Sequence, residues 1–167
     1  MKRRWTRKHI IDRCEVVKEA LHMPAFSTDL IVGFPGETEA DFEDSLDICR
    51  QIGFSKIHMF PFSPRRTTLA AEMSDQIPGD VKSKRGAIVK ELETELRNDY
   101  YKQLVGERLQ VLVEKVSEGF ERNAARGTSC RYGQVEIDAE GVSDNDLVDV
   151  VVTEARADRM MAKRVTS

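Results

Sequence analysis

Residues 28–38 contain the first group of residue types that could bind a ligand, in the order Thr-Asp-Leu-Ile-Val-Gly-Phe-Pro-Gly-Glu-Thr. Glycines allow a backbone to approach a ligand closely, and a helix that starts at Glu39 would direct its free N–H groups to the same place. Asp29 stands inside an otherwise apolar run. A buried carboxylate must be paired or hydrogen-bonded, so Asp29 is either a structural anchor or a ligand contact, and its spacing leaves both open.

A second candidate loop covers residues 60–68, which read Phe-Pro-Phe-Ser-Pro-Arg-Arg-Thr-Thr. Its aromatic side chains could stack on a nucleobase while Arg65 or Arg66 holds a carboxylate or a phosphate. In the alternative, the aromatic side chains are core residues and the arginines are solvated. The residues alone slightly favour this second interpretation.

The histidines and cysteines form no catalytic or metal-binding pattern. They are spread along the chain as His9, His22, His58, Cys14, Cys49 and Cys130. Their spacing fits neither a zinc motif, nor a disulfide framework, nor a Ser-His-Asp arrangement. Free thiols are typical of a reducing compartment, which predicts a cytoplasmic location.

Hydrophobic patterning predicts alternating helices and strands in the first part of the chain. Helices are expected over about residues 7–21 and from Glu39 to Gly53, and short strands over 26–33 and 56–62. The expected apolar helix faces are Ile10, Cys14, Val17 and Leu21 for the first helix and Phe42, Leu46 and Cys49 for the second. This order is typical of an α/β fold in which helices cover a parallel sheet, and ligands of such sheets bind beyond the carboxyl ends of the strands. Both candidate loops follow such strand ends.

The second part of the chain has a different pattern. After Pro78 we expect a long charged helix to about Leu104, with an apolar side formed by Val81, Ile88, Leu92, Leu96 and Tyr100. Five short strands are then expected over 109–116, 120–126, 131–137, 147–153 and 159–165, which predicts a small antiparallel β-barrel. The predicted domain organisation is therefore 1–75, a connecting helix over 76–104, and 105–167.

Composition and charge limit the class of protein. The 167 residues are 40% hydrophobic and 33% charged, which is usual for a globular chain, and no apolar run is long enough to span a membrane. Residues 1–104 hold 17 basic and 17 acidic side chains, whereas residues 105–167 hold 9 and 12. The first 13 residues are strongly basic, with six basic side chains and one acidic one. This end is either a solvated helix entrance or a phosphate contact.

The two loops together resemble the methylthiotransferase branch of the radical S-adenosylmethionine enzymes. The matching segments are residues 1–6, 28–38, 63–68 and 75–78. The resemblance extends over the whole chain, because the part from Val105 is similar to the family's TRAM domain, a small OB-like RNA-binding β-barrel. It implies that the first part is the end of a radical S-adenosylmethionine (β/α) barrel. Residues 52–65 most resemble the branch that acts on threonylcarbamoyladenosine beside the tRNA anticodon, with the isopentenyladenosine branch as the alternative.

The resemblance also implies roles for individual residues. Those expected to line the pocket for S-adenosylmethionine and substrate are Asp29, Gly33, Phe34 and Pro35, and those expected beside the adenine are Phe60 and Ser63. Arg65 would lie near a carboxylate or phosphate, and Arg3 and Arg4 at the mouth where tRNA enters. Charge and loop placement suggest RNA contacts for Arg122, Arg126 and Arg131.

The departures from the family pattern concern catalysis. The family holds two iron–sulfur clusters, yet the Cys-x-x-x-Cys-x-x-Cys motif for the radical cluster is absent from this chain. We therefore expect a carboxyl-terminal part of the enzyme that is inactive alone and is completed by amino-terminal segments or by a second copy at the open sheet edge. Thr67 and Leu69 stand where the family usually has glycine and proline. The alternatives are a stand-alone RNA-binding module and a decayed gene product without function.

Overall fold

The computed structural model describes residues 5–117 and 123–165, and it divides into two units, Met1–Leu96 and Arg97–Ser167. Each unit is described by itself. In the described part of the chain, no helix is both long enough and apolar enough to cross a membrane.

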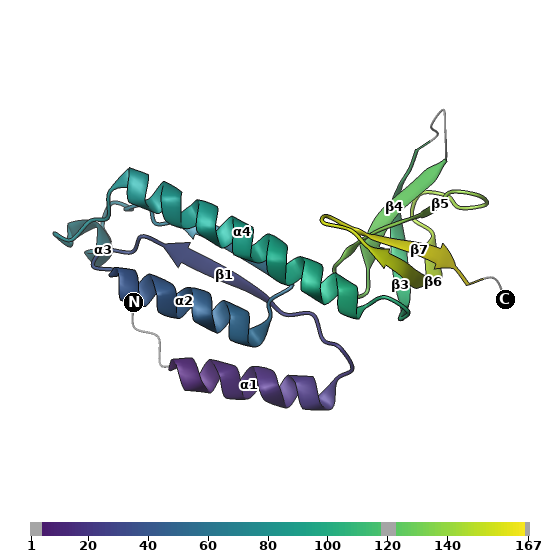
Figure 1. Ribbon diagram of the computed structural model, residues 1–167. Coiled ribbons are helices and arrows are strands. Elements are labelled where there is room, and N and C mark those ends of the chain that lie inside the picture. Colours follow the sequence, from purple (N-terminus) through teal and green to yellow (C-terminus); the bar gives the residue numbers. More distant parts are fainter. Residues whose placement is uncertain (1–4, 118–122, 166–167) are drawn as a thin grey trace. The chain divides into compact units, whose positions relative to one another are not determined.

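The first unit contains one strand–helix–strand motif with helices packed on it (Figure 1). Its elements are α1 (Arg7–Ala20), β1 (Ser27–Val32), α2 (Glu39–Ile52), β2 (Lys56–Pro61), α3 (Leu69–Glu72) and α4 (Gly79–Gln103), the last of which continues into the second unit. Strands β1 and β2 pair in parallel, as expected, with Asp29 opposite His58 and Ile31 opposite Phe60. The carboxyl ends of both strands therefore lie at the same edge.

One apolar cluster holds this unit together. It draws side chains from both strands, from α2 and from α4: Val32, Phe42, Leu46, Cys49, Ile52, Phe54, Ile57, Val89 and Leu92. Figure 1 shows β1 between α2 and α4. The opposite face of the two strands has no such cover among the described residues, and Ile31 and Phe60 are 40% and 51% exposed there.

Local signals placed the helix ends correctly. The Thr6 hydroxyl accepts a hydrogen bond from the His9 N–H at the start of α1. Thr38 and Asp41 form a reciprocal capping box at the start of α2, and Gly53 ends that helix with φ +76°.

The predicted apolar faces of α1 and α4 are partly wrong. Ile10 and Leu21 are exposed, and Ile11 packs against the cluster in their place, whereas Cys14 packs there as predicted. In α4, Ile88 is 40% exposed whereas Val89 is fully buried. Helix α3 was not expected at all.

The second unit contains a closed barrel of five strands. These are β3 (Arg108–Ser117), β4 (Ala124–Ser129), β5 (Gln134–Asp138), β6 (Leu147–Ala155) and β7 (Met160–Arg164), in the spatial order β3-β4-β5-β7-β6. The barrel is not entirely antiparallel as expected, because β5 and β7 pair in parallel. Strands β5 and β6 run in opposite directions. The last strand, β7, lies between them, so it has to be parallel to one of the two.

Two strands differ from their predicted bounds. The strand expected over 120–126 falls partly outside the described residues, and β4 runs on through Gly127 to Ser129. A Cβ at Gly127 would lie 2.0 Å from the Leu112 carbonyl oxygen, so glycine here permits a close strand approach rather than a turn. The strand expected from residue 131 begins at Gln134, because Ser129 organises a turn through bonds to the N–H groups of Arg131 and Gly133.

The last turns of α4 belong to this barrel unit. Tyr100, Tyr101 and Leu104 are 7%, 4% and 1% exposed. The Tyr101 hydroxyl accepts a hydrogen bond from the Gln134 N–H at 3.2 Å. A Cβ at Gly133 would lie 2.9 Å from the Tyr101 ring, so the turn before β5 rests directly on this side chain.

Candidate functional site

A cavity of about 750 Å³ opens at the carboxyl ends of β1 and β2. Its walls come from β1, from the end of β2, and from the loop and short helix that follow: Asp29, Leu30, Ile31, Phe60, Pro61, Phe62, Ser63, Arg65, Thr68 and Ala70. The volume is in the usual range for a site that takes a cofactor or small molecule. The structure thus brings Asp29, Phe60, Ser63 and Arg65 together around one space.

Strand register explains the composition of these walls. Side chains of paired residues in a parallel sheet point to the same face, so Ile31 and Phe60 lie side by side on the face opposite to the apolar cluster. Phe60 is 51% exposed, so the interpretation of this aromatic residue as core is wrong. Asp29 is also exposed, so the expectation of a buried carboxylate that needs a partner is wrong for the same reason.

Gly33, Phe34 and Pro35 stand beside the cavity and are not among its lining residues. Gly33 has φ +74° and is buried, as is Pro35. The Phe34 ring meets the Phe62 ring edge-on at 5.2 Å between centroids, which links the loops that follow β1 and β2. Their roles as pocket residues remain predictions.

The capping box at the start of α2 uses some of the N–H groups that were expected to face a ligand. The Asp41 N–H donates to the Thr38 hydroxyl, and in the loop before the helix the Gly33 N–H donates to Glu37 Oε2 at 2.7 Å. Hydrogen bonds from the Thr38 side chain and backbone hold the pKa of the Asp41 carboxyl below its ordinary value.

Two residues of α4 that sequence reasoning missed support these loops. Arg85 is buried and binds Glu37 and Glu39, and the Lys82 amine donates to the Phe62 carbonyl oxygen at 3.1 Å. A signal was present, because Arg85, Val89 and Leu92 follow one another at helical spacing on the side that proves to be buried.

The loop after β2 contains a strained residue at a position singled out from the sequence. Thr67 has φ +71°, a conformation that favours glycine and is unusual for a β-branched side chain. Its hydroxyl and that of Thr68 donate to the carbonyls of Arg66 and Arg65. The loop therefore adopts the backbone that a glycine would suit, although the residue is threonine.

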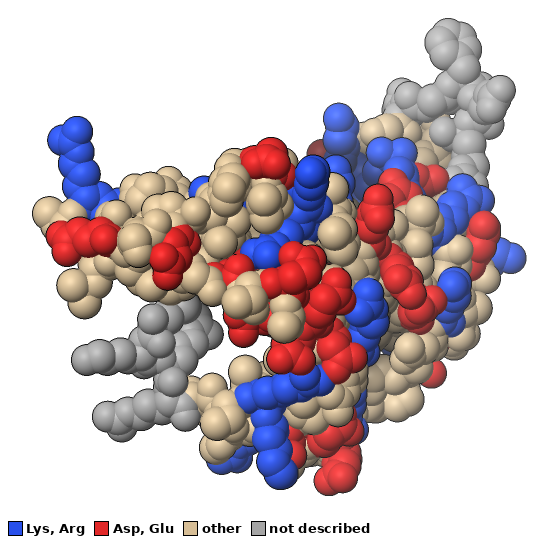
Figure 2. Space-filling model, turned by 60° about the vertical axis from the view of Figure 1, so that its left-hand side comes forward, with Lys and Arg blue, Asp and Glu red and all other residues tan. Residues whose placement is uncertain are grey.

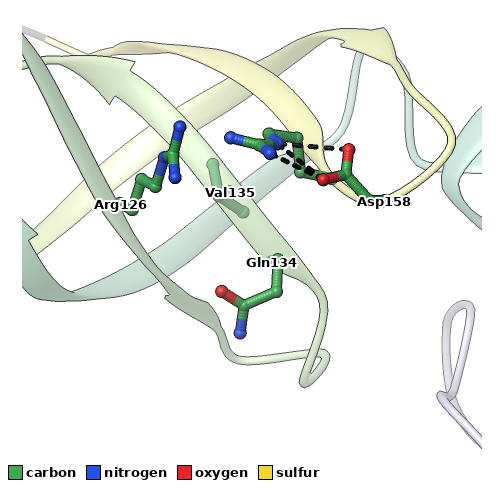
Figure 3. Close-up of a pocket in the computed structure, with 5 residues that line it drawn as sticks. Arg126, Gln134, Val135 and Asp158 are labelled. Atoms are coloured by element: carbon green, nitrogen blue, oxygen red, sulfur yellow. Dashed lines mark hydrogen bonds and ion pairs between the residues drawn. The ribbon is translucent and has the colours of Figure 1, made fainter.

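A smaller cavity of about 120 Å³ lies on the barrel (Figure 3). Arg126 of β4, Gln134 and Val135 of β5, and Asp158 and Arg159 before β7 line it. Both arginines donate to the same carboxylate oxygen of Glu136, Arg126 at 3.1 Å and Arg159 at 2.7 Å. Burial would raise the pKa of Glu136, but these hydrogen bonds outweigh it and the pKa is lowered.

The predicted RNA-contacting arginines are placed differently. Arg126 remains 59% exposed despite its bond to Glu136, so its outer N–H groups stay accessible. Arg131 is half-buried. Burial raises the pKa of Tyr100 to about 12, and the positive charge of Arg131 opposes that rise. Arg3, Arg4 and Arg122 lie outside the described residues.

Sequence reasoning missed Tyr132 in the turn between β4 and β5. Its side chain is 88% exposed, and its φ of +57° is held by the bonds that Ser129 makes across the turn. Figure 2 shows that Lys and Arg side chains are interspersed with Asp and Glu on the visible surface. The face visible in this view therefore offers no broad basic field to a nucleic acid.

The iron–sulfur clusters implied by the resemblance do not fit the residues at hand. Over residues 5–117 and 123–165, no three histidine, cysteine or acidic side chains stand together so that they could hold a metal ion. The Cys49 thiol is buried, which raises its pKa to about 11 and makes it a poor thiolate ligand.

The chain is similar in sequence to several known proteins. It is 36% identical over 157 residues to the tRNA-2-methylthio-N(6)-dimethylallyladenosine synthase of Bdellovibrio bacteriovorus. It is 42% identical over 119 residues to the synthase of the same name from Aquifex aeolicus. It is also 38% identical over 151 residues to the threonylcarbamoyladenosine tRNA methylthiotransferase of Chlamydia pneumoniae. Its homologues are tRNA methylthiotransferases.

The match covers most of this chain and a minor part of each methylthiotransferase. The three alignments take in 93%, 71% and 90% of the chain but 34%, 27% and 35% of the relatives. The chain thus spans about a third of the length of the methylthiotransferases it matches. No family model matches the chain.

Proposed function

We propose that this chain is the carboxyl-terminal part of a tRNA methylthiotransferase, a cytoplasmic enzyme that adds a methylthio group to a modified adenosine next to the anticodon. The observation that carries the proposal is the cavity at the carboxyl ends of β1 and β2. It gathers Asp29 of β1, Phe60 of β2, and Ser63 and Arg65 of the loop after β2 around one space.

The chain's own residues bind and orient the ligands in this proposal. The exposed Phe60 ring offers a flat apolar surface for a purine, and Ser63 lies beside it. Arg65 binds a carboxylate or phosphate, and Asp29 accepts hydrogen bonds from the ligand. S-adenosylmethionine supplies the methyl group when it is bound. The reaction also requires cluster ligands that the described residues do not provide, so the chain is inactive alone.

Amino-terminal segments of the enzyme complete the site. Among the described residues the β1–β2 sheet has two strands, and its cavity-lining face carries exposed Ile31 and Phe60. Further strands would pair with the free edges and close the cavity from the other side. A second copy of the chain at the same edge is the alternative.

The barrel contributes the tRNA contact. In OB-like barrels the second and third strands and the adjoining loops bind oligonucleotides. Here those strands are β4 and β5, which carry Arg126 and Gln134, and the turn between them presents Tyr132 for stacking on an unpaired base of the anticodon stem-loop.

A chimeric enzyme tests the catalytic proposal. This chain replaces the corresponding third of the Bdellovibrio relative, and the chimera is expressed in bacteria that lack tRNA methylthiotransferases. Mass spectrometry of tRNA nucleosides should then detect a 2-methylthio product. We propose threonylcarbamoyladenosine as the substrate because of residues 52–65, while the names of most relatives favour dimethylallyladenosine; the mass of the product distinguishes the two.

Neighbouring arginines provide the matched control. Arg65 lines the cavity and Arg66 does not, although both are exposed. Arg65→Ala should reduce the product at least about tenfold, as expected for the loss of one charge-assisted hydrogen bond, and Arg66→Ala should leave it nearly unchanged. Equal effects of the two substitutions would contradict the assignment of the cavity.

The closed barrel supports a second candidate function, RNA binding without catalysis, because its described strands close on themselves without a strand from the first unit. Fluorescence anisotropy with an anticodon stem-loop RNA tests it on the chain as it stands. RNA binding that Tyr132→Ala weakens, together with an inactive chimera, would favour this function over the enzymatic one.

A further inference from the structure

A buried guanidinium connects α4 to the loop that follows β1. The Arg85 side chain is only 6% exposed. Its Nη1 donates to Glu37 Oε2 at 2.5 Å and to the Glu37 carbonyl at 3.3 Å, and its Nη2 donates to Glu39 Oε2 at 2.9 Å. The guanidinium also lies 5.1 Å from the centre of the Phe42 ring. Four contacts thus fix this side chain against Glu37 in the loop and against the first turn of α2.

The carboxylate of Glu37 passes this constraint to the end of β1. Its Oε2 atom accepts hydrogen bonds from both Arg85 and the Gly33 N–H, the latter at 2.7 Å. The Glu37 side chain is 12% exposed, so its charge depends on these partners for stabilisation. One oxygen atom therefore couples a residue of α4 to the first residue after the strand.

The preceding turn of α4 holds the other loop. Lys82 donates from its amine to the Phe62 carbonyl, just before Ser63 and Arg65. Its aliphatic stem crosses directly over Gly33, where an added Cβ would come within 2.2 Å of Lys82 Cγ. Within four residues, α4 thus contacts the loops after both strands.

We propose that Arg85 is a positioning residue for the cavity at the ends of β1 and β2. It does not line that cavity, yet it fixes Glu37 and thereby the path of the chain from Gly33 onward. Arginine is required because a planar fork can bind two carboxylates at once, whereas a lysine amine is a point charge on a flexible stem. The inference rests on the proposed function only in taking this cavity as the ligand site.

Hydrogen exchange of single backbone amides in the whole chain tests the proposal. The variant is Arg85→Lys, and the control is Lys84→Gln, whose side chain is 80% exposed and pairs with Asp80 across one helical turn. In Arg85→Lys the Gly33 amide should exchange at least about tenfold faster, while the Leu46 and Val89 amides keep their rates within about threefold. Lys84→Gln should change none of the three.

Glu37→Gln provides an independent variant that breaks the same connection from the loop side. It should accelerate exchange at Gly33 as Arg85→Lys does, and combining the two should add little, because both act through one oxygen atom. An unchanged Gly33 rate in Arg85→Lys would overturn the proposal. Equal acceleration at Gly33, Leu46 and Val89 would also overturn it, since it would show a general loss of stability.

A second measurement connects positioning to ligand binding. In the chimeric enzyme, Arg85→Lys should raise the KM for S-adenosylmethionine about tenfold and change kcat less than threefold, because the substitution alters loops that bind and no reacting group. A drop in kcat at constant KM would contradict the assignment. Failure of the chimera itself would refute the proposed function and leave the exchange result as the test of Arg85.

Discussion

Replacement of Gly33 by alanine should be among the most destabilising single-methyl changes in this chain. Two independent features of the structure oppose the new side chain. Gly33 has φ +74°, and its added Cβ would lie 2.2 Å from Lys82 Cγ and 2.6 Å from Lys82 Cδ. Neither carbon atom is at the free end of the lysine, so the whole side chain would have to move.

The size of the effect follows from these two features. A left-handed backbone costs a residue with a Cβ about 1–2 kcal/mol relative to glycine. Displacement of Lys82 removes the bond from its amine to the Phe62 carbonyl at 3.1 Å. For a half-buried charged donor that loss is worth about 1–2 kcal/mol. Gly33→Ala should therefore lower the free energy of unfolding by about 2–4 kcal/mol.

Urea denaturation followed by circular dichroism measures this change, and Gly53→Ala is the matched control. Gly53 has φ +76°, but no atom lies within 4 Å of its added Cβ. Only the backbone cost of about 1–2 kcal/mol then applies. The excess for Gly33 should disappear in a Lys82→Ala background, because the remaining Lys82 Cβ lies at an ordinary contact distance of 3.5 Å.

Two results would refute this reasoning. Equal costs for Gly33→Ala and Gly53→Ala in the otherwise unchanged chain would show that the lysine stem does not constrain the loop. An undiminished cost of Gly33→Ala in the Lys82→Ala background would place the strain elsewhere.

Three further expectations concern other parts of the chain. Thr67→Gly should raise the free energy of unfolding by about 1 kcal/mol, since φ +71° is strained for threonine; Thr68→Gly, at φ −104°, should lower it, and a gain in both would contradict the explanation. Iodoacetamide should modify exposed Cys130 first and Cys49 only on unfolding, because Cys49 is buried with its pKa raised to about 11; mass spectrometry that finds early labelling of Cys49 would disagree. Glu136 has a lowered pKa in the folded chain, so its ionised form stabilises the fold at pH values above the ordinary pKa of 4.5. This contribution is lost as the pH falls through the folded-state pKa, and an NMR titration midpoint for Glu136 at or above 4.5 would contradict the prediction.

The sequence predicted those features that local interactions determine. The predicted helix starts near residue 7 and at Glu39 and the predicted helix end at Gly53 are confirmed, because bonds within three or four residues hold them. The parallel pairing of β1 with β2 was predicted correctly because a helix connects them.

Features that depend on long-range packing were not predictable in the same way. Alternation along β1 cannot reveal which face α2 and α4 cover, so Asp29 was expected to be buried and is exposed. The partner of a strand in a barrel is set by closure of the whole sheet, so the parallel pair of β5 with β7 has no signal in the sequence of either. The helical spacing of Arg85 with Val89 and Leu92 indicates a buried position, but its two acidic partners lie more than forty residues away and local sequence does not identify them.

The burial of the end of α4 limits how the barrel could be transferred from one gene to another. A gene fusion that transferred only residues 105–167 would leave behind Tyr100, Tyr101 and Leu104, which are almost fully buried within the barrel unit. The recipient would then receive a barrel whose turn at Gly133 has lost its contact with Tyr101, and would have to evolve a new cover there. A recombination event that preserves the barrel unit therefore has its breakpoint upstream of Arg97, within α4. The fused helix must then keep the rotational register of its residues as well as the reading frame of the gene.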